Sequence, residues 1–187
     1  MTTRAKKWRL AVAAVAAGAA VLGAATSAQA YSGFTPERYR QIQFGMTKDQ
    51  VWQIGGGSQA CETGGLFGDS VMCWAESSDY APYGGFSFTA DGRMREKRSE
   101  FLLEVRTPSV TLAQYDGTRL GMTEAQVWSV VSEDSCVLRR EGYPNWPATN
   151  GHVEEFYCTA ANGLFPPDAH FTFTDGGLTA RRQYHLS

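Results

Sequence analysis

A short segment that occurs twice constrains the fold of this chain more than any other feature of its sequence. Residues 44–52 are FGMTKDQVW, and residues 120–128, 76 positions later, are LGMTEAQVW. Farther along, the FSFT of residues 86–89 matches the FTFT of residues 171–174 at an offset of 85. The larger second offset means that the second copy contains extra loop residues. Self-similarity of this kind predicts one supersecondary unit that is built twice.

Each copy is expected to open with two short helices. Thr47 and Thr123 each have Gln three residues later, which is the spacing of a capping box at the start of a helix. Pro36 follows Thr35, and proline favours the first position of a helix, so a shorter helix should precede the first repeated segment. Residues 112–115 are its counterpart in the second copy.

The second part of each copy is expected to form a β-sheet. In residues 86–89 and 171–174, phenylalanine alternates with small polar residues, which predicts strands with one apolar face. Asp-Gly pairs at 91–92 and 175–176 predict hairpin turns. We therefore expect an α+β protein of two tandem repeats, each a helix-loop-helix packed on a four-stranded antiparallel sheet.

Residues 1–30 are expected to be a secretory signal peptide. Four basic residues near the start precede an alanine-rich apolar run at residues 10–25 and the small-x-small motif Ala28-Gln29-Ala30. The run is short for a membrane span, and no cysteine follows it for lipid attachment, although a retained N-terminal anchor is the alternative. We expect a secreted, extracellular protein with its first repeat at 31–105 and its second at 106–187.

Removal of the signal peptide changes the net charge. Its residues include four basic and no acidic side chains, so the formal charge of −2 becomes −6. An acidic surface repels nucleic acid and anionic membranes, and neither is an expected partner. A protein partner with a cationic pocket is compatible with this charge.

All four cysteines follow the predicted signal peptide, and an even number in an exported chain predicts two disulfides. Three pairings are available. The cysteines shift between the copies by 75 and 85 positions, so the repeat favours Cys61–Cys73 and Cys136–Cys158. A zinc site is the alternative interpretation, but these spacings do not match the usual close pairs of zinc ligands.

The chain has few signs of an enzyme. His152, His170 and His185 are scattered and lack the spacing of metal ligands. The sequence contains no nucleophile elbow, phosphate-binding loop or dinucleotide-binding glycine turn. We therefore expect no catalytic residues, no metal and no cofactor.

The repeated GMTxxQV core, with a cysteine pair in each copy, resembles the β-lactamase inhibitory protein (BLIP) family over residues 31–187. The most specific match is residues 61–70, CETGGLFGDS, because the GMT core alone also occurs in small envelope-assembly lipoproteins. The resemblance implies that the sheets of the two repeats form one concave surface, which clamps a loop-helix region beside the active site of a class A β-lactamase. The protein would be a reversible inhibitor, and we expect it to be a monomer.

The resemblance also implies roles for individual residues. Asp79 and Tyr80, in the loop after the second cysteine, would enter the active site, where the Asp79 carboxylate mimics the carboxylate of the antibiotic. Phe165, or Leu164 beside it, would fill the subsite for the side chain of the antibiotic. The further enzyme-binding positions are Phe67, Tyr83, Glu100, His170, Arg182 and Tyr184.

Three positions depart from the family pattern. Phe101 replaces a contact lysine, Arg139 replaces a contact tryptophan, and Thr172 replaces a tryptophan of the sheet. These changes motivate an alternative function, a non-inhibitory binding module that acts on a penicillin-binding protein or in cell-envelope development. Without the resemblance, Asp79 would be interpreted as a solvated turn residue and Phe165 as packing for its loop.

Overall fold

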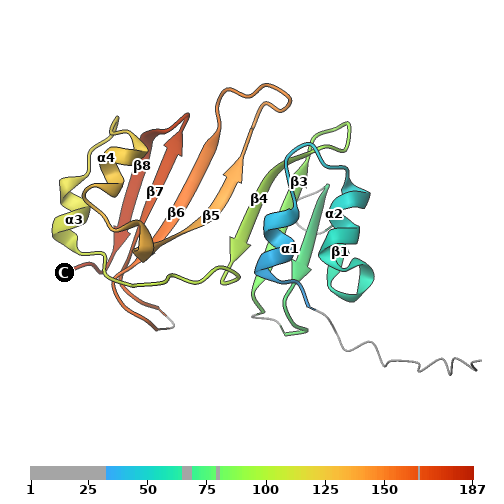
Figure 1. Cartoon of the computed structure of the whole chain (residues 1–187), viewed down its shortest axis with the longest axis horizontal. Helices are drawn as coiled ribbons and strands as arrows, with labels where there is room; N and C mark the ends of the chain where they lie inside the picture. The colour runs from blue at the N-terminus through green and yellow to red at the C-terminus, as the bar shows by residue number, and fades with distance from the viewer. Residues whose placement is uncertain (1–32, 65–68, 79–80, 164) are drawn as a thin grey trace, which may run out of the picture. The chain divides into compact units, whose positions relative to one another are not determined.

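Eight strands form one antiparallel sheet in which each strand pairs with its neighbour in the sequence, from β1 to β8 (Figure 1). The computed structural model describes residues 33–64, 69–78, 81–163 and 165–187, so the expected signal peptide lies outside the described residues. The strands are β1 (Cys61–Thr63), β2 (Ser70–Trp74), β3 (Tyr83–Phe88), β4 (Met94–Glu100), β5 (Cys136–Gly142), β6 (Val153–Thr159), β7 (Asp168–Thr174) and β8 (Gly177–Tyr184).

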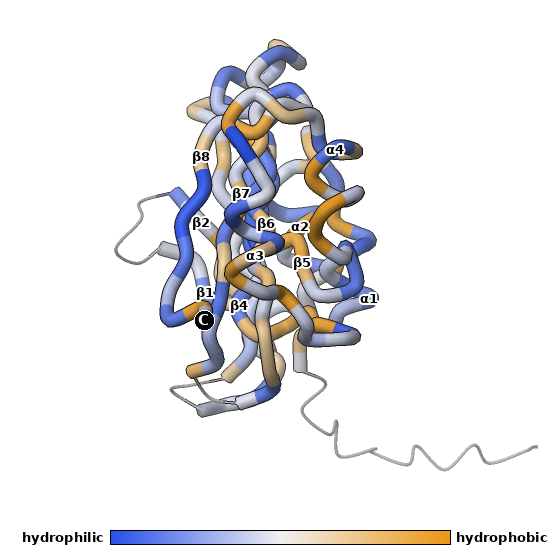
Figure 2. Tube along the Cα trace, turned by 90° about the vertical axis from the view of Figure 1, so that its left-hand side faces the viewer, coloured by the Kyte–Doolittle hydropathy of each residue, from blue (hydrophilic) through white to orange (hydrophobic). Residues whose placement is uncertain are grey.

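Short helices precede each group of four strands. They are α1 (Pro36–Gln41), α2 (Lys48–Gly55) and the 3-10 helix η1 (Gly57–Gln59), then α3 (Leu112–Gly117), α4 (Glu124–Trp128) and the 3-10 helix η2 (Glu133–Ser135). The α-helices lie on one side of the sheet, so the expected α+β class with antiparallel strands is confirmed (Figure 2). Within the described part of the chain, no helix is long and apolar enough to cross a membrane.

Threonine caps determine where α2 and α4 begin. The backbone N–H of Gln50 donates to Thr47 Oγ1 at 3.3 Å, and Thr47 N–H donates to Gln50 Oε1 at 2.9 Å. Thr123 and Gln126 form the same reciprocal pair at α4. Helix α2 is followed by its C-cap Gly56, whose φ of 112° is in the region that a residue with a Cβ enters only with strain. The expected capping boxes are therefore present in both copies.

Two disulfides link neighbouring strands at matching places. Cys61–Cys73 joins β1 to β2, and Cys136–Cys158 joins β5 to β6. These are the pairs that the sequence repeat predicts. Helix α2 packs directly on the first disulfide, because a Cβ added at Gly55 would lie 2.4 and 2.6 Å from its two sulfur atoms.

Each group of helices has its own hydrophobic core against the sheet. In the first core, Phe34 meets Phe86 edge-to-face with ring centroids 5.8 Å apart. In the second, Trp128 meets Phe156 edge-to-face at 4.9 Å. The phenylalanines that alternate in the predicted strands are all buried in these cores: Phe86, Phe88, Phe171 and Phe173.

The two halves of the sheet join where β4 pairs with β5. The pairing is short and includes Lys97 opposite Glu141. The loop after β5 also crosses the junction, since the ring of Tyr143 meets Phe44 edge-to-face at 4.9 Å and Trp146 lies 6.3 Å from the same ring. The first core and the β5–β6 hairpin are thus in direct contact through Phe44, which packs against the first core.

Candidate protein-binding site

The face of the sheet opposite the helices carries polar and aromatic side chains. On β4, Lys97 points toward the helices, where its Nζ lies 5.2 Å from the ring centre of Tyr39. Because successive residues of a strand point to opposite faces, Glu96 and Arg98 lie on the other side. We call this side the open face, and we define it by Tyr83, Glu96, Arg98, Glu100, Arg139, Arg140, Glu155, Tyr157, Asp168, His170, Thr172, Arg182 and Tyr184.

Strand register extends the open face across β6, β7 and β8. Tyr157 is opposite His170, and His170 is opposite Arg182. Two residues farther along the same strands, Asp168 is opposite Tyr184. Phe156, Cys158, Ala169, Phe171 and Phe173, which alternate with these residues on β6 and β7, belong to the second core, so the helix-facing side is apolar along this part of the strands.

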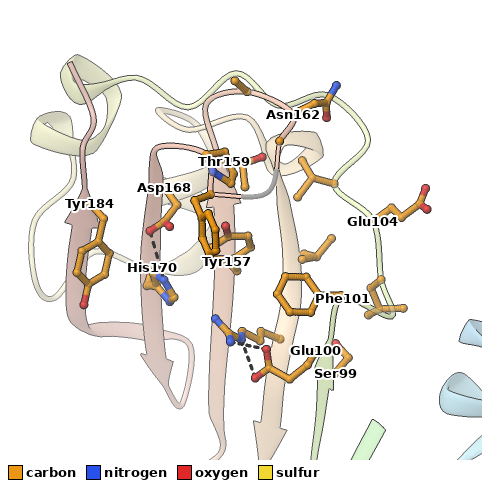
Figure 3. Close-up of a pocket in the computed structure, with 18 of the residues that line it drawn as sticks. Ser99, Glu100, Phe101, Glu104, Tyr157, Thr159, Asn162, Asp168, His170 and Tyr184 are labelled. Atoms are coloured by element: carbon orange, nitrogen blue, oxygen red, sulfur yellow. Dashed lines mark hydrogen bonds and ion pairs between the residues drawn. The ribbon is translucent and has the colours of Figure 1, made fainter. Parts of the chain in front are cut away.

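Two glutamate–arginine pairs connect β4 to β5 on the open face. Arg139 donates to both carboxylate oxygens of Glu100, with Nε 3.1 Å from Oε1 (Figure 3). Arg140 donates to Glu96 at 2.7 Å. A two-pronged guanidinium–carboxylate contact is stronger and better oriented than a single hydrogen bond. Arg139 of the same chain therefore compensates the charge of the Glu100 carboxylate and holds this side chain in place.

His170 lies at the centre of a second polar group and is only 5% exposed. Its Nδ1 is 3.4 Å from Glu155 Oε1 and 3.2 Å from Arg182 Nη2. Its Nε2 is 3.4 Å from Asp168 Oδ1 (Figure 3). Because His170 is almost fully buried, its role on this face is to contact and position Glu155, Asp168 and Arg182.

The two carboxylates beside His170 have pKa values shifted in opposite directions. The hydrogen bond with His170 lowers the pKa of Glu155, and the charge of Arg182 adds to this effect. Burial raises the pKa of Asp168 above its ordinary value. Among the described residues, the buried Asp168 Oδ1 has no partner with hydrogen-bond geometry, which fits this difference.

A cavity of about 590 Å³ opens beside these groups, between the end of β4 and the β6–β7 loop. This volume is within the usual range for ligand pockets, about 300–1,000 Å³. Figure 3 shows Glu100, Phe101, Tyr157, Asp168 and Tyr184 around it. Carboxylates and aromatic rings therefore line a space large enough to hold side chains of a partner.

The structure brings most of the predicted binding residues together. Tyr83, Glu100, His170, Arg182 and Tyr184 all lie on the open face. The other predicted residue within the described ranges is Phe165, which lies in the β6–β7 loop, lines the cavity and is 91% exposed. The remaining predicted positions, Phe67, Asp79, Tyr80 and Leu164, lie outside the described residues.

The family departures have visible consequences on this face. Phe101 directly follows β4, has a φ of 55° and is 76% exposed at the mouth of the cavity. The guanidinium group of Arg139 forms an ion pair with the Glu100 carboxylate. Thr172 lies opposite Ala180, so both side chains at this pair of positions are small.

Sequence reasoning missed several members of the open face. Tyr157, Glu155 and Asp168 hold the predicted residues in place, and Arg98 lies 5.6 Å from the ring centre of Tyr83. A signal was present, because Glu96, Arg98 and Glu100 alternate along one strand and so share one side. The partners on β6 and β7 required the strand register.

Two comparisons show which known proteins this chain is similar to. A solved structure from Streptococcus mutans, described as a candidate β-lactamase inhibitor protein, is similar with 14% identity and a TM-score of 0.47, over 83% of this chain and 91% of that one. The family model for beta-lactamase inhibitor (BLIP) matches residues 35–158. That match spans most of the chain, and the protein therefore belongs to the BLIP family of β-lactamase inhibitors.

Proposed function

We propose that this protein is a secreted inhibitor of class A β-lactamases, which covers the active site of the enzyme reversibly with its open face. The observation that carries the proposal is the gathering of Tyr83, Glu100, His170, Arg182 and Tyr184 on one face without helices, beside a cavity of about 590 Å³. Family membership, two disulfides and the predicted signal peptide support the exported inhibitor.

The inhibitor holds its partner by non-covalent contacts. Its sheet forms a concave surface of two repeats, and the exposed rings of Tyr184 and Phe165 are the anchors, since buried aromatics dominate protein interfaces. His170 positions Arg182 and is not itself a large contact. An interface of standard size reaches nanomolar affinity, about −12 kcal/mol.

Asp79 supplies the competitive part of the inhibition. Its carboxylate occupies the place of the antibiotic carboxylate and meets the hydroxyl and cationic groups that hold the antibiotic, while Tyr80 lies beside it. Charge-assisted hydrogen bonds of this kind are the strong ones. This part of the proposal rests on the resemblance of the loop after Cys73 to the family.

The test is titration of the purified protein, residues 31–187, into class A β-lactamases that hydrolyse a chromogenic cephalosporin. The expected result is a stoichiometric loss of rate that Asp79→Asn weakens more than about tenfold, because a charge-assisted bond becomes a neutral one. Asp49→Asn, on the exposed surface of α2, should inhibit like the unchanged protein. No loss of rate at excess inhibitor would contradict the proposal, and equal inhibition by Asp79→Asn would remove its substrate-mimicking part.

A second candidate is binding to a penicillin-binding protein without inhibition of β-lactamases. The pairing of Arg139 with Glu100, together with Phe101 at the cavity mouth, favours it because these departures change the charge that the cavity offers. Protection of a purified penicillin-binding protein from labelling by a fluorescent penicillin, with no effect on β-lactamases, is the result that would select this alternative.

A further inference from the structure

Glu141, His152 and Glu154 meet on the helix-facing side of the sheet, away from the open face. Glu141 and Glu154 are directly opposite each other on β5 and β6. His152 precedes Glu154 by two residues and so lies on the same side, as does Phe156 of the second core. One ligand atom from each of the three side chains lies within 4.8 Å of the other two.

The ligand atoms of this cluster are close enough together to surround one ion. His152 Nε2 is 3.3 Å from Glu141 Oε1, and His152 Nδ1 is 3.8 Å from Glu154 Oε2. Zinc–nitrogen and zinc–oxygen bonds are about 2.0–2.2 Å, so two ligands of a tetrahedral ion are about 3.4 Å apart. The two distances involve different ring nitrogens, and one ion binds only one of them, so the Glu154 carboxylate would have to rotate toward Nε2 to complete the set.

The cluster also brings several carboxylates close to one lysine. Like charges directly opposite each other destabilise a strand pair, and these carboxylates are only 19% exposed. Lys97 Nζ is 3.5 Å from Glu141 Oε2, but Glu124 adds a further negative charge near Glu154. A divalent cation would add positive charge to this group of carboxylates.

The histidine itself is available as a ligand. Its Nε2 is buried and, among the described residues, has no partner with hydrogen-bond geometry. The ring is held flat against Tyr143, with centroids 4.4 Å apart. The ring is thus fixed by stacking with a carboxylate beside each of its nitrogens, and ligating histidines commonly have a carboxylate next to the ring nitrogen that does not bind the metal.

We propose that Glu141, His152 and Glu154 bind one divalent transition-metal ion of the zinc class, with water completing the coordination. One imidazole and two carboxylates suit this class, whereas calcium and magnesium take oxygen ligands. The ion clamps the ends of β5 and β6 across the 143–152 connection. This site departs from our expectation of no metal, which considered only the spacing of histidines along the chain.

Isothermal titration calorimetry with zinc chloride in metal-free buffer tests the proposal, independently of any inhibition assay. The expected result is one zinc ion per chain with a micromolar Kd and no comparable heat with calcium. Glu154→Gln and His152→Asn should each weaken binding more than about tenfold. The matched controls Glu133→Gln and His185→Asn remove exposed groups outside the cluster and should leave the Kd unchanged.

Far-UV circular dichroism and Tm in EDTA establish that each variant is folded. If His152→Asn does not fold, the isosteric Glu154→Gln decides, and Lys97→Met should tighten binding because it removes a nearby positive charge. Absence of stoichiometric zinc binding overturns the proposal. So does an unchanged Kd in Glu154→Gln, or an equal loss of affinity in the control variants.

Discussion

Glu100 and Asp168 are both largely buried carboxylates of the open face, but they have different partners. Glu100 accepts two hydrogen bonds from Arg139, which compensates for its loss of water. Asp168 has the nearby His170 ring but no partner with hydrogen-bond geometry for its buried Oδ1 within the described ranges. The two carboxylates therefore differ in how their loss of water is compensated.

Asp168→Asn is expected to stabilise the free protein at neutral pH. Burial raises the pKa of Asp168, so its protonated form is favoured by folding, and the ionised form costs stability once the pH exceeds the folded pKa. The gain in Tm should therefore be present at pH 7 and disappear below the ordinary value of 3.8, where the group is protonated in both states. Thermal unfolding at several pH values measures this, with the exposed Asp116→Asn as the control. A gain that grows toward low pH would contradict the assignment.

Helix α2 and the first disulfide form one tightly packed element. Gly55 ends the helix at the point where a side chain would meet the sulfurs of Cys61 and Cys73. The two halves have matching disulfides. In each half, the helices pack over a pair of strands that a disulfide joins.

Gly55→Ala should lower the free energy of unfolding by about 1–3 kcal/mol, because the added methyl group overpacks the contact with the disulfide. The helix propensity of alanine favours the opposite sign, by about 1 kcal/mol, so the sterics must exceed it. Urea denaturation under oxidising conditions measures the change. Gln53→Ala, on the exposed side of the same helix, should shift the midpoint little, and a stabilised Gly55→Ala would show that α2 can move away from the disulfide.

At the scale of the whole molecule, the two cores depend on a narrow junction. The ladder between β4 and β5 is short, and the contact of Phe44 with Tyr143 and Trp146 adds to it. We expect the halves to unfold together because the open face and the cavity both use residues from each side of this junction.

Phe44→Ala should destabilise the protein by about 2 kcal/mol, since it removes apolar contacts both from the first core and from the loop of the β5–β6 hairpin. Urea denaturation followed by tryptophan fluorescence and by far-UV circular dichroism measures the loss. Phe165→Ala, at a residue that is 91% exposed, should leave stability within about 0.5 kcal/mol while it weakens inhibition. An unchanged midpoint in Phe44→Ala would mean that this contact does not couple the halves.

Local signals in the sequence predicted the elements well. Thr47 with Gln50, and Thr123 with Gln126, specify helix starts because a cap needs only neighbouring residues. The alternating phenylalanines predicted which side of β3 and β7 is buried. The repeat also predicted the disulfide pairs, since equivalent cysteines occupy equivalent places.

The amino-acid sequence by itself determined the helix starts, the disulfide pairs, the alternating apolar strands and the family. Only the tertiary structure decided which distant side chains meet: Glu100 with Arg139, His170 with Asp168, and Glu141 with His152 and Glu154. The reason is physical. Caps and alternation depend on residues a few positions apart, whereas a pair across strands depends on register, and a slip of one residue would turn each of these side chains to the opposite face.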